Sequence, residues 1–484
     1  MAAPCGSAAS AAWPHVEAAR SSERQHDRRG AREPYDRGGD AAGDANGGGM
    51  ILILSGLPLR WCCMQWFHFC GKSGTMLRMK TKITLVVATA FAVGVMVAQE
   101  NAIEKFDPRM ALEKATVDTK GVKWIDGRYL PLEGKCFSNT AAFYDRLPSN
   151  VTERVNAGVR GMKNHSSGLQ FRFSTDSGIL HFRWKPINAR LAMDHMPSTG
   201  VSGIDVYRQD ADGKWRYVKT GRLRDAKTGG SLKISWKPGD PCLVNLPLYN
   251  GITSFSLGIE KNAEVKALGP RKSGINKPVV FYGTSITHGG CASRPGLAFP
   301  SIVGRDLDVP IVNLGFSGSG RMEFEMSEHL AAIDASCYVL DCLWNMGNVK
   351  DSKAKSVEDL KGVKPGPDAL VRARYEPFIR NLRKLRPNVP IIMAEQCDVY
   401  CKGPSVKDVF IKKLYDKLIA EGWKNLVYLP KTDMYTGDLE GTVDGVHPND
   451  LGMMSMSKAF GKAVREALGM TEPSWWEFWN WFND

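Results

Sequence analysis

Apolar and polar residues alternate in short runs over one long stretch of this chain, between residues 101 and 270. The clearest runs are Leu169–Ser174 and Ile179–Trp184, and turn signals such as Asp210–Gly213 and Pro238–Asp240 separate the runs. Alternation with a period of two, without helical patterns between the runs, is typical of antiparallel strands that bury one face. The pattern therefore predicts a β-sandwich, jelly-roll-like in type, that forms an accessory domain over residues 101–270.

A different rhythm, strand then loop then helix, begins near residue 275. Runs typical of buried strands fall at 278–282, 310–314, 337–342, 389–394 and 426–429. Helical patterns fall near 297–307, 324–334, 367–386, 405–422 and 450–468. Such alternation predicts a parallel sheet covered by helices on both faces, and ligands bind such sheets at the carboxyl ends of the strands. We therefore predict an α/β catalytic domain over residues 275–470, joined to the sandwich by the Lys/Gly/Pro-rich linker 268–277.

The first 75 residues share neither rhythm. Residues 1–49 are rich in Ala, Gly, Arg and Asp and have little apolar periodicity, which is typical of disorder. Residues 50–70 are apolar in patches that Arg60 interrupts, and a membrane helix there is the alternative. We expect residues 1–75 to be either disordered or an extension that is not translated.

A basic stretch and an apolar run follow, in Met76–Lys82 and Ile83–Ala98. This order, with a small residue at its end, predicts a secretory signal peptide over residues 76–98 and a secreted or periplasmic protein. Because signal peptides belong at the start of a chain, we expect translation to begin at Met76 or Met79. The alternative is a signal anchor preceded by a cytoplasmic tail, whereas no stable membrane span is expected in the mature protein.

Composition changes this picture little. Hydrophobic residues make up 43% and charged residues 24% of the 484 residues, as in ordinary globular proteins. The net charge of +13 is spread widely, and no stripe of Lys and Arg interleaves with aromatic residues, so nucleic acid is not a predicted partner. The tail 471–484 is unusually aromatic; it either docks on the protein surface or contacts a ligand, membrane or partner. The sequence leaves the oligomeric state open.

The cysteines do not predict a disulfide scaffold or a metal. Seven of the 11 cysteines lie after Ala98, and an odd number at these spacings is not typical of small disulfide-bonded domains. Cys397 and Cys401 are the pair that a bridge would join in an oxidising compartment, if their geometry allows it. No CxxC pair and no His/Cys cluster has the spacing of a zinc site, so we predict no structural metal.

Candidate chemistry lies where the carboxyl-end loops of the predicted parallel sheet belong. Ser285 follows the first strand, and Asp444 and His447 precede the last helix, so the three chemical types that acyl transfer needs are present. The pattern predicts Ser285 as the nucleophile, His447 as the base and Asp444 as its orienting carboxylate. The backbone N–H groups of Ser285 and Gly318 and the side-chain amide of Asn345 are the predicted oxyanion donors. Taken singly, each fragment is as typical of a turn or a helix cap.

Three further polar residues and one glycine-rich loop need an interpretation. His288 is close to Ser285 in sequence, and we expect a polar residue at the rim of the site rather than the base. Arg294 either holds a substrate oxygen or pairs with a carboxylate. Glu395, at the end of the fourth strand, either lines the pocket or makes structural hydrogen bonds. The loop Gly315–Gly320 lacks the Gly-Lys-Ser/Thr ending of a phosphate loop, so we attribute its glycines to close backbone approach to the oxyanion.

With these residues in view, the region 275–470 resembles the SGNH (GDSL-type) hydrolases. Four blocks carry the resemblance, in the order Gly283–Ile286, Gly318, Asn345 and Asp444–His447. Thr284 stands where the first block of that family has Asp, and Leu343 and Met346 flank Asn345 where its third block usually reads Gly-x-Asn-Asp. The resemblance implies a three-layer α/β/α fold with a flavodoxin-like sheet, no metal and no organic cofactor.

A narrower resemblance points to a substrate class. Gly283–Gly296 and Asp341–Met346 are similar to segments of secreted bacterial GDSL-like acylhydrolases that carry an N-terminal β-sandwich. Members of that group are commonly associated with deacetylating plant or host polysaccharides. Residues and resemblance together predict a serine esterase that removes small acyl groups, acetyl above all, from a small molecule or a polysaccharide. The alternatives are a lipase or thioesterase acting on longer acyl chains, and a carbohydrate-binding protein whose hydrolase fold has lost catalysis.

Overall fold

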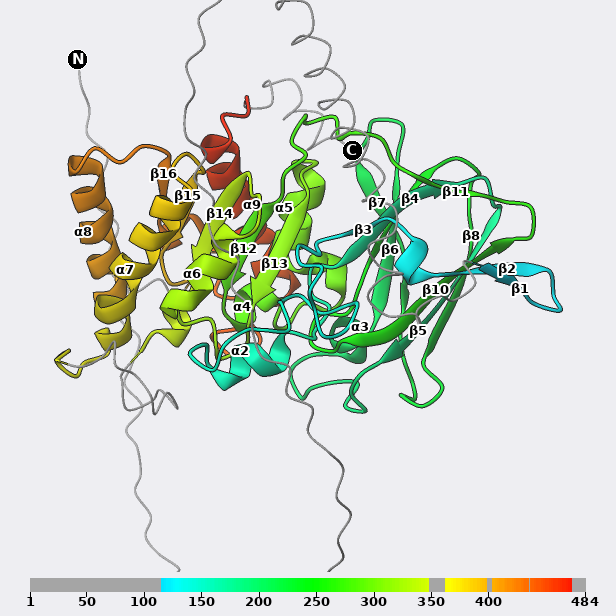
Figure 1. Ribbon diagram of the computed structural model, residues 1–484, viewed down its shortest axis with the longest axis horizontal. Helices are drawn as coiled ribbons and strands as arrows, with labels where there is room; N and C mark the ends of the chain where they lie inside the picture. The colour runs from blue at the N-terminus through cyan, green and yellow to red at the C-terminus, as the bar shows by residue number, and fades with distance from the viewer. Residues whose placement is uncertain (1–114, 348–361, 398–402, 435, 472–484) are drawn as a thin grey trace, which may run out of the picture. The chain divides into compact units, whose positions relative to one another are not determined.

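The computed structural model describes residues 115–347, 362–397, 403–434 and 436–471. All of these residues belong to one compact unit, Val97–Asp484. Two antiparallel sheets come first in sequence, and a helix-covered parallel sheet follows (Figure 1). The predicted extension 1–75, the predicted signal peptide 76–98 and nearly all of the aromatic tail lie outside the described residues, as does Cys401.

The alternating half forms two antiparallel sheets. The first has the order β1-β2-β10-β5-β8, with strands Ala115–Val117, Val122–Asp126, Ile252–Glu260, Ile179–Pro186 and Gly230–Ser235. The second has the order β11-β4-β9-β6-β7 with β3 paired to β4, and its strands are Val265–Ala267, Gln170–Thr175, Pro241–Asn245, Ile204–Gln209, Trp215–Gly221 and Leu132–Glu133. Short helices in this half are η2 (Gly127–Tyr129), α2 (Ala157–Met162) and α3 (Ser198–Val201).

Alternate positions of these strands fill one apolar core. Along β5, Leu180, Phe182 and Trp184 are buried whereas the residues between them are not. The rings of Phe171 and Phe255 stack with centroids 4.5 Å apart. Two facing sheets with one shared core confirm the predicted β-rich half.

The second half contains a five-stranded parallel sheet of order β13-β12-β14-β15-β16, with strands Ile311–Gly315, Val279–Gly283, Cys337–Asp341, Ile391–Ala394 and Leu426–Leu429. This is the strand order of flavodoxin-like sheets, as predicted. The strands are buried on both faces, so they read as continuous apolar runs rather than as alternation. Their side chains still alternate in space, since Val280 and Tyr282 join one apolar cluster and Val279 and Phe281 join the other.

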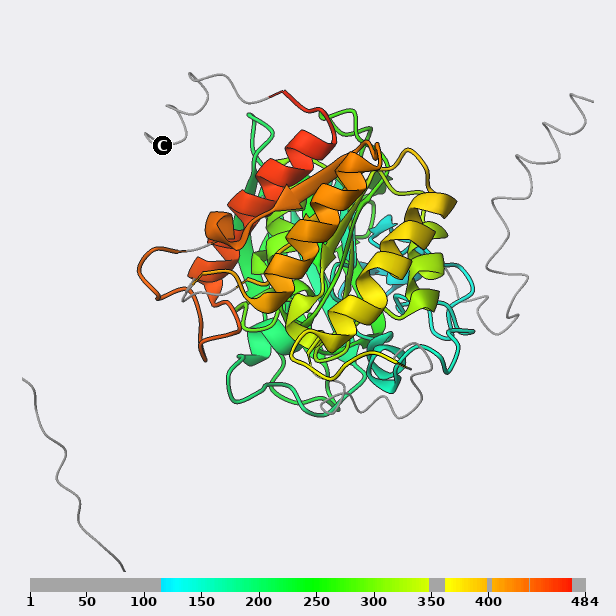
Figure 2. The same ribbon diagram turned by 90° about the vertical axis from the view of Figure 1, so that its left-hand side faces the viewer.

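Helices cover both faces of this sheet. One apolar cluster holds residues of α4 (Ser285–His288), α5 (Phe299–Asp306) and α9 (Asp450–Ala467). The other holds residues of α6 (Phe324–Ala331), α7 (Ala369–Leu385) and α8 (Val406–Ala420), and Figure 2 shows α7 and α8 side by side. Single-turn helices lie in the loops: η3 (Pro295–Leu297), η4 (Leu343–Asn345) and η7 (Lys431–Met434). Among the described residues, no helix is long and apolar enough to cross a membrane.

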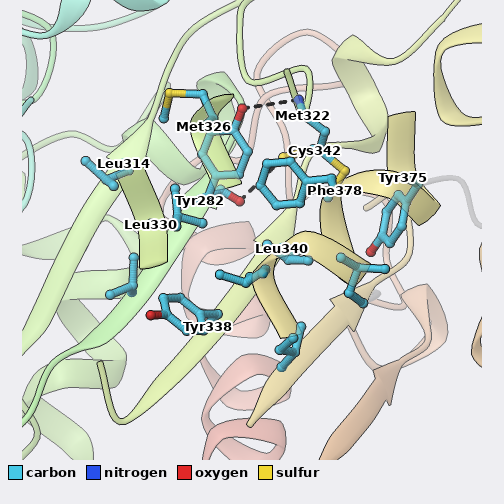
Figure 3. Close-up of a cluster of buried hydrophobic side chains, with 14 of the residues drawn as sticks. Tyr282, Leu314, Met322, Met326, Leu330, Tyr338, Leu340, Cys342, Tyr375 and Phe378 are labelled. Atoms are coloured by element: carbon cyan, nitrogen blue, oxygen red, sulfur yellow. Dashed lines mark hydrogen bonds between the residues drawn. The ribbon is translucent and has the colours of Figure 1, made fainter. Parts of the chain in front are cut away.

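Tyr282, the residue before Gly283 in the strand that leads to Ser285, is anchored in the core (Figure 3). Its ring stacks on Phe378 of α7 with the planes 12° apart, and its hydroxyl accepts the N–H of Met322 at 3.1 Å. The thiol of Cys342 lies 3.6 Å from its carbonyl oxygen. These contacts fix the carboxyl end of β12 and so the position from which Ser285 projects.

The two halves share core residues, which the sequence did not indicate. Leu147, Val155 and Val159, all N-terminal to the sandwich strand β4, are buried in the cluster that contains Tyr282. The segment predicted as a linker also holds both halves, because buried Arg271 pairs with Glu133 of β3 and, at 3.0 Å, with Asp308. The sandwich half therefore supports the sheet of the other half rather than standing apart from it.

Candidate active site

Ser285 stands at the carboxyl end of β12. That strand is buried throughout, and the chain turns from it directly into α4, of which Ser285 is the first residue. The hydroxyl oxygen of Thr284 accepts the N–H of Ile286 at 3.3 Å and so closes the turn. Ser285 is only 7% exposed. Its hydroxyl thus lies at the edge of the sheet where α/β folds bind ligands.

Ser285, His447 and Asp444 form a continuous hydrogen-bonded set. Oγ of Ser285 lies 2.8 Å from Nε2 of His447, and Nδ1 of His447 lies 2.7 Å from Oδ2 of Asp444. With Nδ1–H donated to the carboxylate, Nε2 keeps the lone pair that accepts a proton from a hydroxyl. The structure therefore brings together the three residues that the sequence singled out from opposite ends of the α/β half.

The loop that carries His447 is held by its own hydrogen bonds. Oδ1 of Asp444 accepts the backbone N–H groups of His447 at 2.7 Å and of Val446 at 3.0 Å. The next helix, α9, is capped by Asn449, whose side chain accepts the N–H of Leu451. The helix therefore has its own cap, and Asp444 is free to serve the imidazole.

Hydrogen bonding keeps Asp444 ionised. Its partial burial acts to raise the carboxyl pKa, but the backbone and imidazole N–H groups of His447 and the N–H of Val446 together lower the pKa from 3.8 to about 2. A carboxylate that stays charged at neutral pH fixes the tautomer of His447 and stabilises the imidazolium that forms during acyl transfer.

Asn345 offers an unused hydrogen-bond donor. Its Nδ2 is buried and has no hydrogen-bond partner among the described residues. It ends η4, which is fixed from both sides: Nζ of Lys407 donates to the carbonyl of Leu343 at 2.6 Å, and the indole N–H of Trp344 donates to the carbonyl of Cys397. A buried amide without a hydrogen-bond partner costs free energy and so calls for an explanation. A donor that is held rigidly is suited to stabilise the negative charge that develops on a substrate oxygen in the transition state.

The glycines of the loop after β13 are under different constraints within the protein, and their close approach to an oxyanion stays a prediction. Gly318 has φ +64°, which favours glycine, but a Cβ there would meet nothing within 4 Å. Close packing within the protein applies to Gly320, where a Cβ would lie 2.0 Å from the carbonyl oxygen of Gly283. Gly318 is therefore needed for its backbone conformation, while Gly320 lets the loop pack against the strand that carries Ser285.

A tyrosine from the sandwich half holds the backbone of Ser285. The hydroxyl of Tyr249 donates to the carbonyl oxygen of Ser285 at 2.9 Å, and its ring stacks on His288 with centroids 4.3 Å apart. Tyr249 follows β9 in a stretch with no motif and no periodicity, so only the folded chain reveals it. Likewise, His195 reaches the site from the sandwich half and places its ring 5.7 Å from the ring of His447.

Two predicted positions, Arg294 and Glu395, make structural contacts. Arg294 pairs with Asp205 at 2.9 Å and donates to the hydroxyl of Tyr207, so it joins the two halves. Glu395 accepts the hydroxyl of Tyr428 and the N–H of Lys431, and it is buried. These contacts correspond to the carboxylate pairing left open for Arg294 and to the structural hydrogen bonds left open for Glu395, and substrate binding by either residue stays a prediction.

The rim position predicted for His288 is wrong. Its side chain is fully buried, and its Nε2 lies 3.2 Å from Nδ1 of His165. Burial, together with the positive charge of Arg146 and the neighbouring His165, lowers the pKa of His288 well below its ordinary value. His288 is thus a neutral, buried residue that packs against Tyr249 and His165.

The protein has a parallel α/β sheet with a Ser–His–Asp set at its carboxyl edge, which is the arrangement found in serine hydrolases of the α/β class. Two family models match the chain: residues 276–465 match the GDSL-like Lipase/Acylhydrolase family, and residues 122–265 match the N-terminus of Esterase_SGNH_hydro-type. Each half of the chain therefore matches its own family model, the α/β half that of GDSL-like lipases/acylhydrolases and the sandwich half that of the N-terminus of SGNH-type esterases.

Solved structures agree with this assignment. A protein from Bacteroides ovatus, assigned as a GDSL-like lipase, is 26% identical with a TM-score of 0.59, over 73% of this chain and 100% of that one. Salicylyl-acyltransferase SsfX3 from a tetracycline biosynthetic pathway is 17% identical with a TM-score of 0.54, over 73% of this chain and 99% of that one, and shows the fold alone. No protein of curated function matches the sequence.

Proposed function

We propose that the protein is a serine esterase that hydrolyses small acyl esters through an acyl-enzyme. Oγ of Ser285 attacks the ester carbonyl while Nε2 of His447 takes its proton. The alkoxide of the substrate then leaves as the alcohol with that proton, and water, activated by the same imidazole, releases the acid and regenerates Ser285. The observation that carries this proposal is the unbroken set Ser285–His447–Asp444, with bonds of 2.8 and 2.7 Å.

The tetrahedral intermediate needs donors for its oxyanion. The unpartnered Nδ2 of Asn345 is the side-chain donor that we assign to it, together with the backbone N–H groups of Ser285 and Gly318. Such donors act without reorganisation because η4 is already fixed by Lys407 and Trp344. Each donor contributes about 3 kcal/mol to transition-state stabilisation.

Acetyl groups on carbohydrate are the substrate class that we propose. Support for a short acyl group comes from the confinement of Ser285, which is 7% exposed. Support for carbohydrate comes from the similarity of Gly283–Gly296 to secreted acylhydrolases with an N-terminal sandwich. A lipase or thioesterase remains the second candidate, and a chain-length series from p-nitrophenyl acetate to palmitate separates the two. Turnover that falls steeply with chain length supports acetyl removal.

The proposed nucleophile is tested by Ser285→Ala. We expect the variant to lose hydrolysis of p-nitrophenyl acetate by about 10⁴-fold or more, because the attacking atom is gone. Ser149→Ala, at an exposed position, is the matched control and should keep full activity. Unchanged hydrolysis in Ser285→Ala would refute the assignment, and an inactive parent protein would favour the carbohydrate-binding alternative.

Export is a further proposal, which depends on the pattern of residues 76–98. Sequencing the N-terminus of the protein released by its own cells tests it. A mature terminus just after Ala98 supports a cleaved signal peptide, and a retained apolar segment favours the signal anchor.

A further inference from the structure

Besides Ser285 and Asp444, His447 has two neighbours that can ligate a metal. His195, from the loop between β5 and α3, and Cys291, three residues after α4, both face its ring. The nitrogen, sulfur and nitrogen atoms that these three residues offer all lie within 4.8 Å of one another. The three ligand atoms come from segments that are about 100 and about 150 residues apart, which is why no sequence spacing revealed the cluster.

Two imidazoles and one thiol form the donor set that zinc prefers. Zn²⁺ takes His nitrogen at about 2.0–2.1 Å and Cys sulfur at about 2.3 Å, in tetrahedral geometry that separates neighbouring ligand atoms by roughly 3.3–3.8 Å. The cluster is therefore within a small side-chain adjustment of a three-ligand site, with the fourth position left for water or an anion. His195 and His447 are only partly buried, so a cation can enter from solvent.

The hydrogen bond from His447 to Asp444 leaves Nε2 of His447 able to bind either a metal or a proton. Because Nδ1 donates to Asp444, the nitrogen left to coordinate a cation is Nε2. A carboxylate behind a histidine is the arrangement that orients and strengthens histidine ligands in zinc sites. The same Nε2 lies 2.8 Å from Oγ of Ser285, so one lone pair serves either the serine or the cation.

We propose that His195, Cys291 and His447 form an inhibitory site for a borderline-soft divalent cation of the zinc type. On binding, the thiol of Cys291 gives its proton to the buffer and forms a sulfur–metal bond, with no change of oxidation state. His447 then holds the cation on Nε2 and no longer accepts the proton of Ser285. The inhibition rests on the proposed function, whereas the binding of the cation does not.

Zinc inhibition is measured on the full chain by titrating ZnCl₂ into p-nitrophenyl acetate hydrolysis in a non-chelating buffer. We expect inhibition that a chelator reverses. Relative to its own rate without zinc, each of the variants Cys291→Ser and His195→Asn should need at least ~10-fold more zinc for half-inhibition than the wild type does, since loss of a ligand weakens metal binding at least as much as loss of a residue that orients a ligand. Cys136→Ser and His181→Asn, in the sandwich half and outside the cluster, should behave as the wild type.

Cobalt binding is the readout that needs no activity. Co²⁺ added to the full chain should give a thiolate-to-cobalt charge-transfer band that Cys291→Ser lacks, with thermal melts showing that the variant is folded. If the band appears but the protein hydrolyses no ester, the metal site stands and the proposed function fails. Absence of the band in the wild type, or zinc inhibition of equal strength in both ligand variants, would overturn the site.

Discussion

Substitution of Asn345 should affect the catalytic rate and the stability of the protein in different ways. Its Nδ2 is buried without a partner among the described residues, so Asn345→Ala removes a donor that the resting protein does not use. We expect kcat for p-nitrophenyl acetate to fall about 10²–10³-fold, as for the loss of an oxyanion donor. The free energy of unfolding should stay level or rise, because an unsatisfied buried amide has been removed.

Both quantities are measured on the same samples, by steady-state kinetics and by urea unfolding. Asn139→Ala, at an exposed position, is the control and should change neither. A variant that loses stability and activity in parallel would show that Asn345 acts by supporting the fold, and the donor role would then be wrong.

Asp341 gives the protein a pH-dependent stability. This residue ends β14 and is fully buried, and burial raises its pKa from 3.8 to about 7, although the hydroxyl of Thr287 donates to it at 2.7 Å. The folded state thus keeps a proton that the unfolded state loses above pH 3.8. The stabilising contribution is complete below pH 3.8 and is lost as the pH rises towards 7.

We therefore expect Asp341→Asn to remove that part of the pH dependence. Urea unfolding between pH 4 and pH 7 should show a flatter curve for the variant, with its advantage over the wild type growing as the pH rises. Asp212→Asn, in an exposed turn, should keep the wild-type slope. Parallel curves for Asp341→Asn and the wild type would contradict a raised pKa at Asp341.

The sequence was enough to find the residues whose chemistry is local. Ser285 follows a buried strand, and Asp444 and His447 are three residues apart before a capped helix, so strand position and spacing sufficed. Tyr249 and His195 could not be found in this way, because they meet Ser285 and His447 only through long-range packing. Nor does the sequence show which carboxylate a charged residue will meet, which is why both interpretations of Arg294 were left open.

Tyr249, in the loop between β9 and β10, ties the sandwich to the nucleophile turn. Tyr249→Phe removes the 2.9 Å hydrogen bond to the carbonyl of Ser285 but keeps the ring that stacks on His288. We expect kcat to fall about 10-fold with KM nearly unchanged, since a small displacement of the nucleophile is costly. Stability should fall by about 1 kcal/mol.

Steady-state kinetics on p-nitrophenyl acetate gives the two parameters separately. Tyr217→Phe is the matched control, because it too removes a hydroxyl of the sandwich half, one that bonds Thr220 at 2.9 Å on the surface. A purely structural role for Tyr249 would appear as lower stability with wild-type kcat, and positioning of Ser285 would then be refuted.

Strands and helices of the α/β half were predicted well for a physical reason. Parallel strands buried on both faces leave long apolar runs, and α7 and α9 repeat their apolar residues with helical period, so tertiary packing and local pattern agree. The sequence predicted less where the structure depends on contacts between distant elements. The predicted linker 268–277 is an example: its Lys/Gly/Pro composition indicates a loop, but not that Arg271 is buried between Glu133 and Asp308.

The buried contacts between the halves decide whether either can fold alone. Leu147, Val155 and Val159 lie in the apolar cluster of the parallel sheet, and burying such a side chain contributes about 1.5–3 kcal/mol. Buried Arg146 donates to the carbonyl oxygens of Asn313 and Gly315, at 2.9 and 3.1 Å. Losing these contacts removes an amount comparable with the whole stability of an ordinary domain, about 5–15 kcal/mol.

Residues 275–470 expressed alone should therefore fail to fold, although they contain all the residues of the proposed triad. We expect no cooperative thermal or urea transition and no hydrolysis of p-nitrophenyl acetate from this fragment, whereas a chain of residues 101–470 should show one transition and full activity. In the longer chain, Arg146→Met should lower the midpoint of that single transition, because two buried carbonyls lose their donor. A fragment 275–470 that unfolds cooperatively and retains wild-type kcat would mean that the sandwich is an appendage, and the support assigned to Tyr249 and Arg146 would fall with it.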